Sequence, residues 1–278
     1  MPLLQRQCAI VLALLVLSLS AACQDKSHAI MAVNREVGLS FSPSLIAYGE
    51  YGSAWLNSEH GWVKGGGFKA SAPFETLRTH WLAEATYEYD DGTSKHTMPN
   101  ASPMVAAFIT NDMFVGIGPT FTPTSRFSVT PGADVEYREW HRGLPFNELD
   151  LIEHYTFWAP GIGVRAAYNP LGRFVVTARS GFAYTVFPTM AGSGDADPTV
   201  QVPPHTFSLN QHDVWQAGLG IDYPMGGRVH AFAGIDYSRF GFGESTSAYE
   251  GSVLKGQHHE PNSVTDLAKV NVGIAWSY

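Results

Sequence analysis

The chain has 278 residues, of which 13% are aromatic and 15% are charged, and its formal net charge is −8. An acidic chain without a Lys/Arg cluster cannot neutralise phosphates, which excludes nucleic acid as a partner. After the first 29 residues the chain contains no run of eighteen apolar residues. Its apolar residues fall at alternate positions instead, which indicates strands rather than membrane-spanning helices.

The N-terminus predicts a secretory signal peptide. Arg6 is the only charge before an apolar run over residues 9–19, which is too short to cross a membrane and is typical of the centre of such a signal. Small residues allow cleavage after Ala22 or after Ala29, and the second site is favoured. We therefore expect residues 1–29 to be removed and residues 30–278 to form one domain.

Two cysteines occur, and both precede the favoured cleavage site. Cleavage after Ala29 would remove Cys8 and Cys23, leaving no thiol for a disulfide. Residues 19–23, Leu-Ser-Ala-Ala-Cys, are similar to a lipoprotein signal, but Ser20 stands where such signals carry Leu. Lipidation of Cys23 is therefore the less favoured interpretation.

Ten segments alternate apolar with polar or small residues, the period of a strand that separates lipid from a polar interior. We predict strands over residues 36–48, 62–71, 80–89, within 104–121, and over 128–140, 156–168, 173–186, 215–223, 229–238 and 270–278. Aromatic residues near the strand ends are expected to form two interfacial girdles: Trp62, Trp81, Tyr89, Trp140, Trp158, Trp215 and Trp276. A soluble sandwich also alternates, but it would need neither so many aromatic residues nor an aromatic terminal strand.

The inward-facing positions of these strands carry charges of both signs, namely Glu84, Glu88, Asp134, Glu136, Asp222 and Asp236 against Arg138, Arg165, Arg179 and Lys269. Because each buried charge needs a partner, we expect a structural ion-pair network that plugs the lumen, with Glu136 and Arg165 as one suggested pair. The alternative is a narrow, gated pathway for small solutes, in which the excess of acids would favour cations. Ten strands leave too little free width for a wide pore.

Two further motifs carry weaker signals. The run Gly65-Gly66-Gly67 lacks the Gly-Lys-Ser/Thr of a phosphate-binding loop and is expected to relieve crowding in a curved strand. His258-His259-Glu260 has no second spaced pair of ligands and is expected to be a solvated loop. No metal and no cofactor are therefore expected.

A protease of the omptin type must also be weighed, because omptins are ten-stranded barrels whose loop-end acids and a His activate water. Asp90-Asp91 and His212-Asp213 invite that comparison. Omptins pair residues two apart on one face, whereas adjacent residues in a strand point to opposite faces. No Gly-x-Ser-x-Gly nucleophile occurs either. No catalytic residue is therefore expected, and proteolysis is the less favoured alternative.

The last nine residues place Val270, Val272, Ile274, Trp276 and Tyr278 on one face of a strand. This ending resembles the C-terminal assembly signal of bacterial outer-membrane barrels, which is an aromatic last residue preceded by apolar residues at every second position. With the segments 130–138, 232–238 and 260–278, most of the chain is similar to Gram-negative outer-membrane barrels of the porin-like or surface-antigen type. The resemblance implies surrounding outer-membrane lipid and a barrel-assembly machinery that binds the last strand.

The sequence therefore predicts an all-β, transmembrane, antiparallel up-and-down barrel of about ten strands, monomeric, in the cell envelope. Such barrels put short turns in the periplasm and long loops outside, so both termini are expected in the periplasm. The expected outer loops span roughly residues 50–61, 90–103, 141–154, 187–213 and 243–266. The expected function is a structural or surface-interaction role with a plugged lumen.

Overall fold

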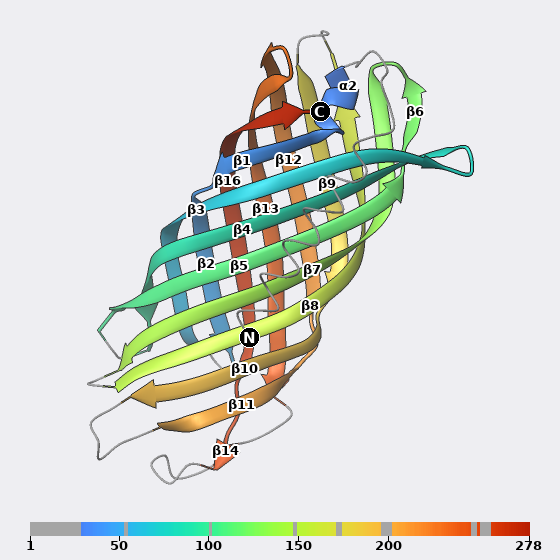
Figure 1. Ribbon diagram of the computed structural model, residues 1–278. Coiled ribbons are helices and arrows are strands. Elements are labelled where there is room, and N and C mark those ends of the chain that lie inside the picture. The colour runs from blue at the N-terminus through green and yellow to red at the C-terminus, as the bar shows by residue number, and fades with distance from the viewer. Residues whose placement is uncertain are drawn as a thin grey trace.

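The computed structural model describes residues 29–52, 55–99, 102–146, 149–170, 174–195, 202–245, 249–250 and 257–278. These residues form a closed antiparallel barrel with one short helix, α2 (Ala29–Val33), at one mouth (Figure 1). No helix within these ranges is long and apolar enough to cross a membrane. Except for Ala29, which begins α2, the predicted signal segment lies outside the described residues, and so do Cys8, Cys23 and the candidate cleavage site after Ala22.

The wall consists of ten strand positions, as predicted. Three of them are interrupted strands: β1 (Glu36–Phe41) with β2 (Ser44–Tyr51), β9 (Val175–Tyr184) with β10 (Val186–Asp195), and β11 (Val202–Asn210) with β12 (Asp213–Gly226). The others are β3 (Trp55–Thr76), β4 (Thr79–Thr97), β5 (Met104–Pro119), β7 (Phe127–Phe146), β8 (Leu149–Tyr168), β13 (Val229–Ser245) and β16 (Asn262–Ser277). The short strands β6 (Phe121–Thr124), β14 (Tyr249–Glu250) and β15 (Gln257–His258) lie outside this ring.

The last strand closes the barrel. β16 pairs with β1 and β2 on one edge and with β13 on the other, from Val229↔Trp276 to Phe242↔Ser263. Closure leaves no free edge in this ring, which is the condition for a sheet to sit in lipid.

The outer wall carries an apolar belt. Large apolar side chains are exposed at outward positions of most wall strands: Leu39, Phe41, Phe68, Ile117, Ile162, Val164, Leu219, Ile221, Ile235, Val270, Val272 and Ile274. Aromatic residues flank them, with Trp62, Tyr89, Tyr137, Trp158, Trp215 and Tyr237 toward the long-loop end and Phe121, Tyr168, Tyr223 and Trp276 toward the other. A belt between two aromatic girdles is the surface that a barrel presents to a bilayer. We treat the segments inside the girdles as membrane-spanning.

One of the aromatic residues expected in the girdles lies elsewhere. Trp140 was expected at the interface, but its side chain is only 1% exposed because it points into the barrel, and that prediction is wrong. Trp81 is half-buried and stacks on Phe74, with ring centroids 6.2 Å apart.

Most of the expected long loops are strand. β3 already begins at Trp55, β4 continues to Thr97, and β10 and β11 occupy much of the connection expected over residues 187–213. β7 and β8 pair without interruption from Phe127↔Tyr168 to Phe146↔Leu149. Above the belt the outer face no longer meets lipid, so the apolar alternation that predicts a strand disappears while the backbone hydrogen bonds continue. The predicted loop boundaries are wrong for this reason.

The mouth near the C-terminus is crossed by the N-terminal segment, and in Figure 1 α2 and the C-terminus lie together at the upper end of the barrel. Ile30 and Val33 of α2 pack against Ala167 and Val175. Ser71 donates a hydrogen bond to the Val33 carbonyl at 3.1 Å, and Ser277 donates one to the Ala32 carbonyl at 3.1 Å.

Tyr278, which follows β16, belongs to the same mouth. Its hydroxyl donates to the Ser71 carbonyl at 2.9 Å, and the Arg35 guanidinium lies 5.7 Å from its ring centroid. The N-terminal segment and the terminal aromatic residue are thus fixed to several wall strands at once.

Candidate functional site: a charged lumen closed by an aromatic layer

The inward side chains form layers along the barrel axis. Nearest to α2 lies a cluster around His230 of β13. His230 Nδ1 is 2.7 Å from the Asp222 carboxylate, and its Nε2 is 3.2 Å from Glu36 Oε2. Lys69 Nζ is 2.6 Å from the other Glu36 oxygen and 3.6 Å from the Phe232 ring centroid. The partner of Asp222 is therefore a histidine, which is an inward residue of the predicted ninth strand.

The next layer surrounds a cavity of about 170 Å³. Arg165 Nε lies 2.8 Å from Glu84 Oε1, and Arg179 Nη2 lies 2.9 Å from Asp236 Oδ1. Asp134 lines an adjoining cavity together with Arg165 and Arg179. The charges in this layer come from β4, β7, β8, β9 and β13, so they bring distant wall strands into contact.

A third layer contains Lys269 and Arg138. Lys269 contacts Glu88 and lies 3.2 Å from Asp90, while Arg138 lies 2.7 Å from both Asp112 and Glu136. Asp90 was expected in a loop and Asp112 was not considered. Their even numbers place them on the inward face of β4 and β5, so strand parity could have found both.

Glycines make room for these charges. A Cβ atom at Gly65 would lie 1.8 Å from Asp90 Oδ1, and one at Gly218 would lie 2.1 Å from Asp236 Oδ1. A side chain at either position would displace a carboxylate from its cationic partner. Gly65 thus has a packing role within the lumen.

The suggested pairing of Glu136 with Arg165 is wrong. Glu136 pairs with Arg138, and Arg165 pairs with Glu84. In the β7–β8 register Glu136 faces Ala159, whereas Arg165 faces Thr130. The six residue steps from Thr130 to Glu136 span about 20 Å of strand, so the two charges lie at different levels along the barrel axis. Strand order predicts neighbouring strands but does not fix their register.

Beyond Arg138, an aromatic layer fills the lumen, where a polar interior was expected. Trp140 contacts Tyr48, Phe108 and Tyr155, with centroids 5.0, 5.3 and 5.0 Å away. Phe242 continues the layer, 5.3 Å from Tyr155 and 5.6 Å from Phe157, and Phe157 lies 5.6 Å from Phe240. We call these seven residues, Tyr48, Phe108, Trp140, Tyr155, Phe157, Phe240 and Phe242, the aromatic layer.

The aromatic layer crosses the barrel rather than coating one wall. Trp140 belongs to β7 and Tyr48 to β2, and β3, β4 and β5 stand between these two strands in the sheet. All seven side chains are at most 3% exposed. Interior aromatic packing of this kind is the core of a domain and not the wall of an open channel.

Outside the aromatic layer, at the long-loop end, lies the Arg142 cluster. The Arg142 side chain is 0% exposed; it contacts Glu59 and lies 3.1 Å from Glu50 and 2.8 Å from Glu153. Its guanidinium also lies 4.4 Å from the Tyr48 ring centroid. His96 Nδ1 is 2.9 Å from Glu59, and Tyr155 donates a hydrogen bond to Glu260 at 2.6 Å.

Negative charge exceeds positive charge in the Arg142 cluster, and the pKa shifts follow. Burial, together with the nearby Glu153, raises the pKa of Glu260 well above its usual value. Burial also raises the pKa of Glu153. Glu59 differs: although burial opposes the shift, the Arg142 guanidinium and hydrogen bonds from His96 and Ser94 lower its pKa. Of these residues only Glu260 was named from the sequence, in a segment expected to be a solvated loop, and its burial contradicts that expectation. The others were missed because they lie beyond the predicted strand ends.

The residues considered for an omptin-like site lie on separate strands. Asp90 points inward from β4 and accepts a hydrogen bond from Thr110 at 3.1 Å in addition to its contact with Lys269. Asp91 follows it on the opposite face. His212 Nδ1 lies 2.6 Å from Asp213 at the start of β12. In the ring, β4 and β12 are separated by β5, β7, β8 and β9 on one side.

Comparisons with known proteins address the fold. No protein-family model matches the chain, and no curated protein matches its sequence. Among solved structures, the outer membrane protease OmpT from Escherichia coli is similar, with a TM-score of 0.57, 9% identity, and coverage of 87% of this chain and 95% of that chain. The chain has the fold of an outer-membrane β-barrel.

Two further solved structures share the barrel architecture less closely. A major outer membrane protein from Thermus thermophilus has a TM-score of 0.43 and 12% identity, covering 86% of this chain and 99% of that chain. The translocator domain of the autotransporter NalP from Neisseria meningitidis has a TM-score of 0.40 and 12% identity, covering 97% of this chain and 96% of that chain. Similarity at this level carries no function from one barrel to another.

Proposed function

We propose that the protein is an outer-membrane barrel with a closed lumen, and that its role is structural or in surface interaction rather than in transport. The observation that carries the proposal is the aromatic layer, whose side chains meet across the barrel and leave the Arg142 side chain fully buried beyond it. A solute that entered from the α2 mouth would have to displace the whole layer. Both termini face the periplasm in this proposal, because the connections at the α2 end are the short ones.

The charge pattern supports the same role. Arg138, Arg165, Arg179 and Lys269 each contact a carboxylate from another strand, so the lumen charges tie the wall together. A buried ion pair adds little net stability, but the removal of one partner is strongly destabilising because it leaves an uncompensated buried charge. With the interior occupied in this way, the long-loop end is the surface left for interaction with other molecules, and the last strand is the site for the assembly machinery.

A narrow cation pathway is the second candidate. The cavity beside Arg165 and Arg179 favours it, because it is lined by Glu84, Glu88 and Asp236 and could hold a small cation or water. In this alternative the aromatic layer would have to open as a gate. A protease is the third candidate, and its sole support is the fold that the chain shares with OmpT. Cleavage of added peptides by the refolded protein would favour this candidate.

Single-molecule conductance of the refolded protein in a planar bilayer tests the proposal, with Glu136→Gln measured beside it. We expect both proteins to be silent, because the aromatic layer lies between Glu136 and the long-loop end. Refolding is checked by the compact mobility of unheated samples on a gel. Stable current steps whose size changes in Glu136→Gln would overturn the closed lumen and establish the cation pathway.

A further inference from the structure

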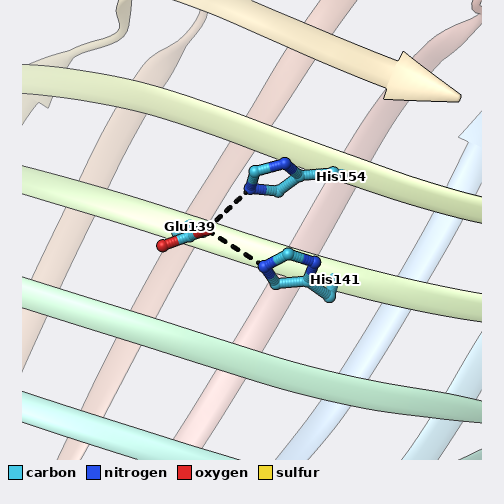
Figure 2. A group of neighbouring side chains, drawn as sticks. All are labelled: Glu139, His141 and His154. Atoms are coloured by element: carbon cyan, nitrogen blue, oxygen red, sulfur yellow. Dashed lines mark hydrogen bonds and ion pairs between the residues drawn. The ribbon is translucent and has the colours of Figure 1, made fainter. Parts of the chain in front are cut away.

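Three metal-ligating side chains meet on the outer wall of the barrel, away from the lumen. Glu139 and His141 belong to β7 and His154 to β8 (Figure 2). His141 and His154 face each other in the β7–β8 register, and Glu139 lies two residues before His141 and so shares its face. The register alone therefore brings the three residues together.

Their atoms converge on a small volume. Glu139 Oε1 lies 2.8 Å from His154 Nε2 and 3.0 Å from His141 Nε2. The two imidazole rings are stacked, with centroids 4.0 Å apart and planes 10° apart. The three potential ligand atoms all lie within 4.8 Å of one another. An ion placed among them would need only small side-chain rotations to reach bonds of about 2.0–2.2 Å, the length typical of zinc centres.

The cluster is open on one side. The side chains of His141 and His154 are 38% and 35% exposed, while that of Glu139 is 13% exposed. An ion held by these residues would keep free coordination positions toward solvent, as zinc sites with three protein ligands do. The cluster lies just beyond the girdle pair Tyr137 and Trp158, whose centroids are 4.8 Å apart, so it stands above the membrane belt.

The donor set selects the class of ion. Two imidazoles and one carboxylate suit Zn²⁺, Cu²⁺ or Ni²⁺, whereas Ca²⁺ and Mg²⁺ prefer oxygen ligands only. Metal-bound imidazole must be neutral.

A second group, Glu36, Asp222 and His230, also has ligand atoms within 4.8 Å of one another. It differs in two ways. All three residues are buried inside the barrel, and the Lys69 ammonium already contacts Glu36 at 2.6 Å. A resident cation and the lack of an open side make this group an ion-pair cluster, and the outer group is the better metal site.

We propose that Glu139, His141 and His154 form a surface site for a divalent transition-metal ion of the Zn²⁺ class. The ion would join β7 to β8 above the membrane belt and present open coordination positions to external ligands. This inference goes beyond the closed-lumen proposal and does not depend on it, because the site lies on the outer face of the wall.

Equilibrium binding of Zn²⁺ to the refolded, untagged protein tests the site, with Co²⁺ as a spectroscopic probe of coordination. We expect one bound ion per chain, and a loss of affinity of at least about tenfold in His141→Ala and in His154→Ala, since even changes to outer-shell partners of metal ligands cost that much. Glu139→Gln is expected to weaken binding as well. Zn²⁺ should also raise the temperature at which the wild-type barrel loses its compact gel mobility.

His212→Ala is the matched control. His212 is also a half-exposed histidine beside a carboxylate, with Asp213 at 2.6 Å. It stands at the start of β12, which β9 separates from β8, and it forms no three-ligand group with the other described residues. We expect this variant to bind Zn²⁺ as the wild type does. Absence of stoichiometric binding by the wild type would overturn the proposal. Unchanged binding by the double variant His141→Ala/His154→Ala would overturn it too, because the ion would then sit elsewhere.

Discussion

At the scale of single residues, the Arg142 cluster shows how a buried charge is retained. The Arg142 guanidinium forms ion pairs with Glu50, Glu59 and Glu153. Tyr155 donates a hydrogen bond to Glu260, which adds a fourth carboxylate to the cluster. Because four carboxylates share one arginine, they cannot all be ionised at low cost. Burial raises the pKa of Glu260 and of Glu153, so proton uptake by these two carboxyls begins at a higher pH than in the unfolded chain.

This proton uptake predicts a pH dependence of stability. The pKa of Glu260 is higher in the folded state than its ordinary value of 4.5, so the folded protein binds more protons than the unfolded chain between those two values. The stability that Glu260 gives to the folded state is therefore fully present below pH 4.5, and it is lost as the pH rises through the pKa of Glu260 in the folded protein. We expect Glu260→Gln to make the barrel less sensitive to rising pH than the wild type.

The measurement is the temperature at which compact gel mobility is lost, taken across a series of pH values. Glu244→Gln is the control, because Glu244 is exposed on the neighbouring end of β13. Glu59 has the opposite effect on the pH dependence of stability, because its lowered pKa gives stability that is lost as the pH falls. The prediction is therefore tested by the difference between the pH profiles of Glu260→Gln and the wild type. Equal pH profiles for the two proteins would contradict the prediction.

At the scale of elements, the β3–β4 hairpin carries local strain. Its two turn residues, Leu77 and Arg78, have φ angles of 52° and 63°. Left-handed backbone is unfavourable for side chains with a Cβ, and two-residue hairpin turns of this conformation prefer Asn-Gly. Leu77 is 95% exposed, so its side chain contributes no packing in return.

Replacing the turn should therefore stabilise the barrel. We expect Leu77→Asn/Arg78→Gly to raise the free energy of unfolding by about 1 kcal/mol, as relief of such strain does elsewhere. Urea-induced unfolding in detergent or lipid measures the change. Arg126→Gly is the control, since Arg126 lies in a short turn and is not among the described residues with positive φ, and it should give no gain. A loss of stability in the double variant would contradict the prediction.

At the scale of the whole molecule, the aromatic layer fills the lumen and closes the barrel. It joins β2, β5, β7, β8 and β13, so the wall strands are held across the lumen as well as along their edges. The charged layers below and above it depend on the same closure, because Arg138 lies 4.2 Å from the Phe240 ring centroid and Arg142 lies over Tyr48.

Two tryptophans on neighbouring strands test this arrangement. Trp140 is 1% exposed in the lumen, and Trp158 is 43% exposed on the outer wall. We expect Trp140→Ala to destabilise the barrel by about 3–5 kcal/mol, because it leaves a cavity in a packed core, and Trp158→Ala to cost clearly less. Fluorescence quenching by brominated lipids should act on Trp158 and spare Trp140. Equal costs for the two variants would contradict a packed lumen.

The sequence by itself determined the barrel class, the ten wall strands and the face that each belt residue takes. These follow from local alternation, because lipid outside and polar groups inside impose a period of two on every segment within the belt. Strand parity likewise places Glu84, Arg138 and Lys269 inside. Above the belt, apolar and polar residues no longer alternate, so the residue pattern did not predict the full lengths of β4, β7 and β8.

Tertiary structure alone decided which side chains meet. Register sets Arg165 against Glu84 rather than Glu136, and it sets His141 against His154 on the outer wall. Closure of the ring brings Trp140 against Tyr48 and Arg142 against Glu59, although each pair is far apart in the sequence. A pattern along one strand carries no information about the level at which another strand passes it, and that level determines the lumen, its closure and the candidate metal site.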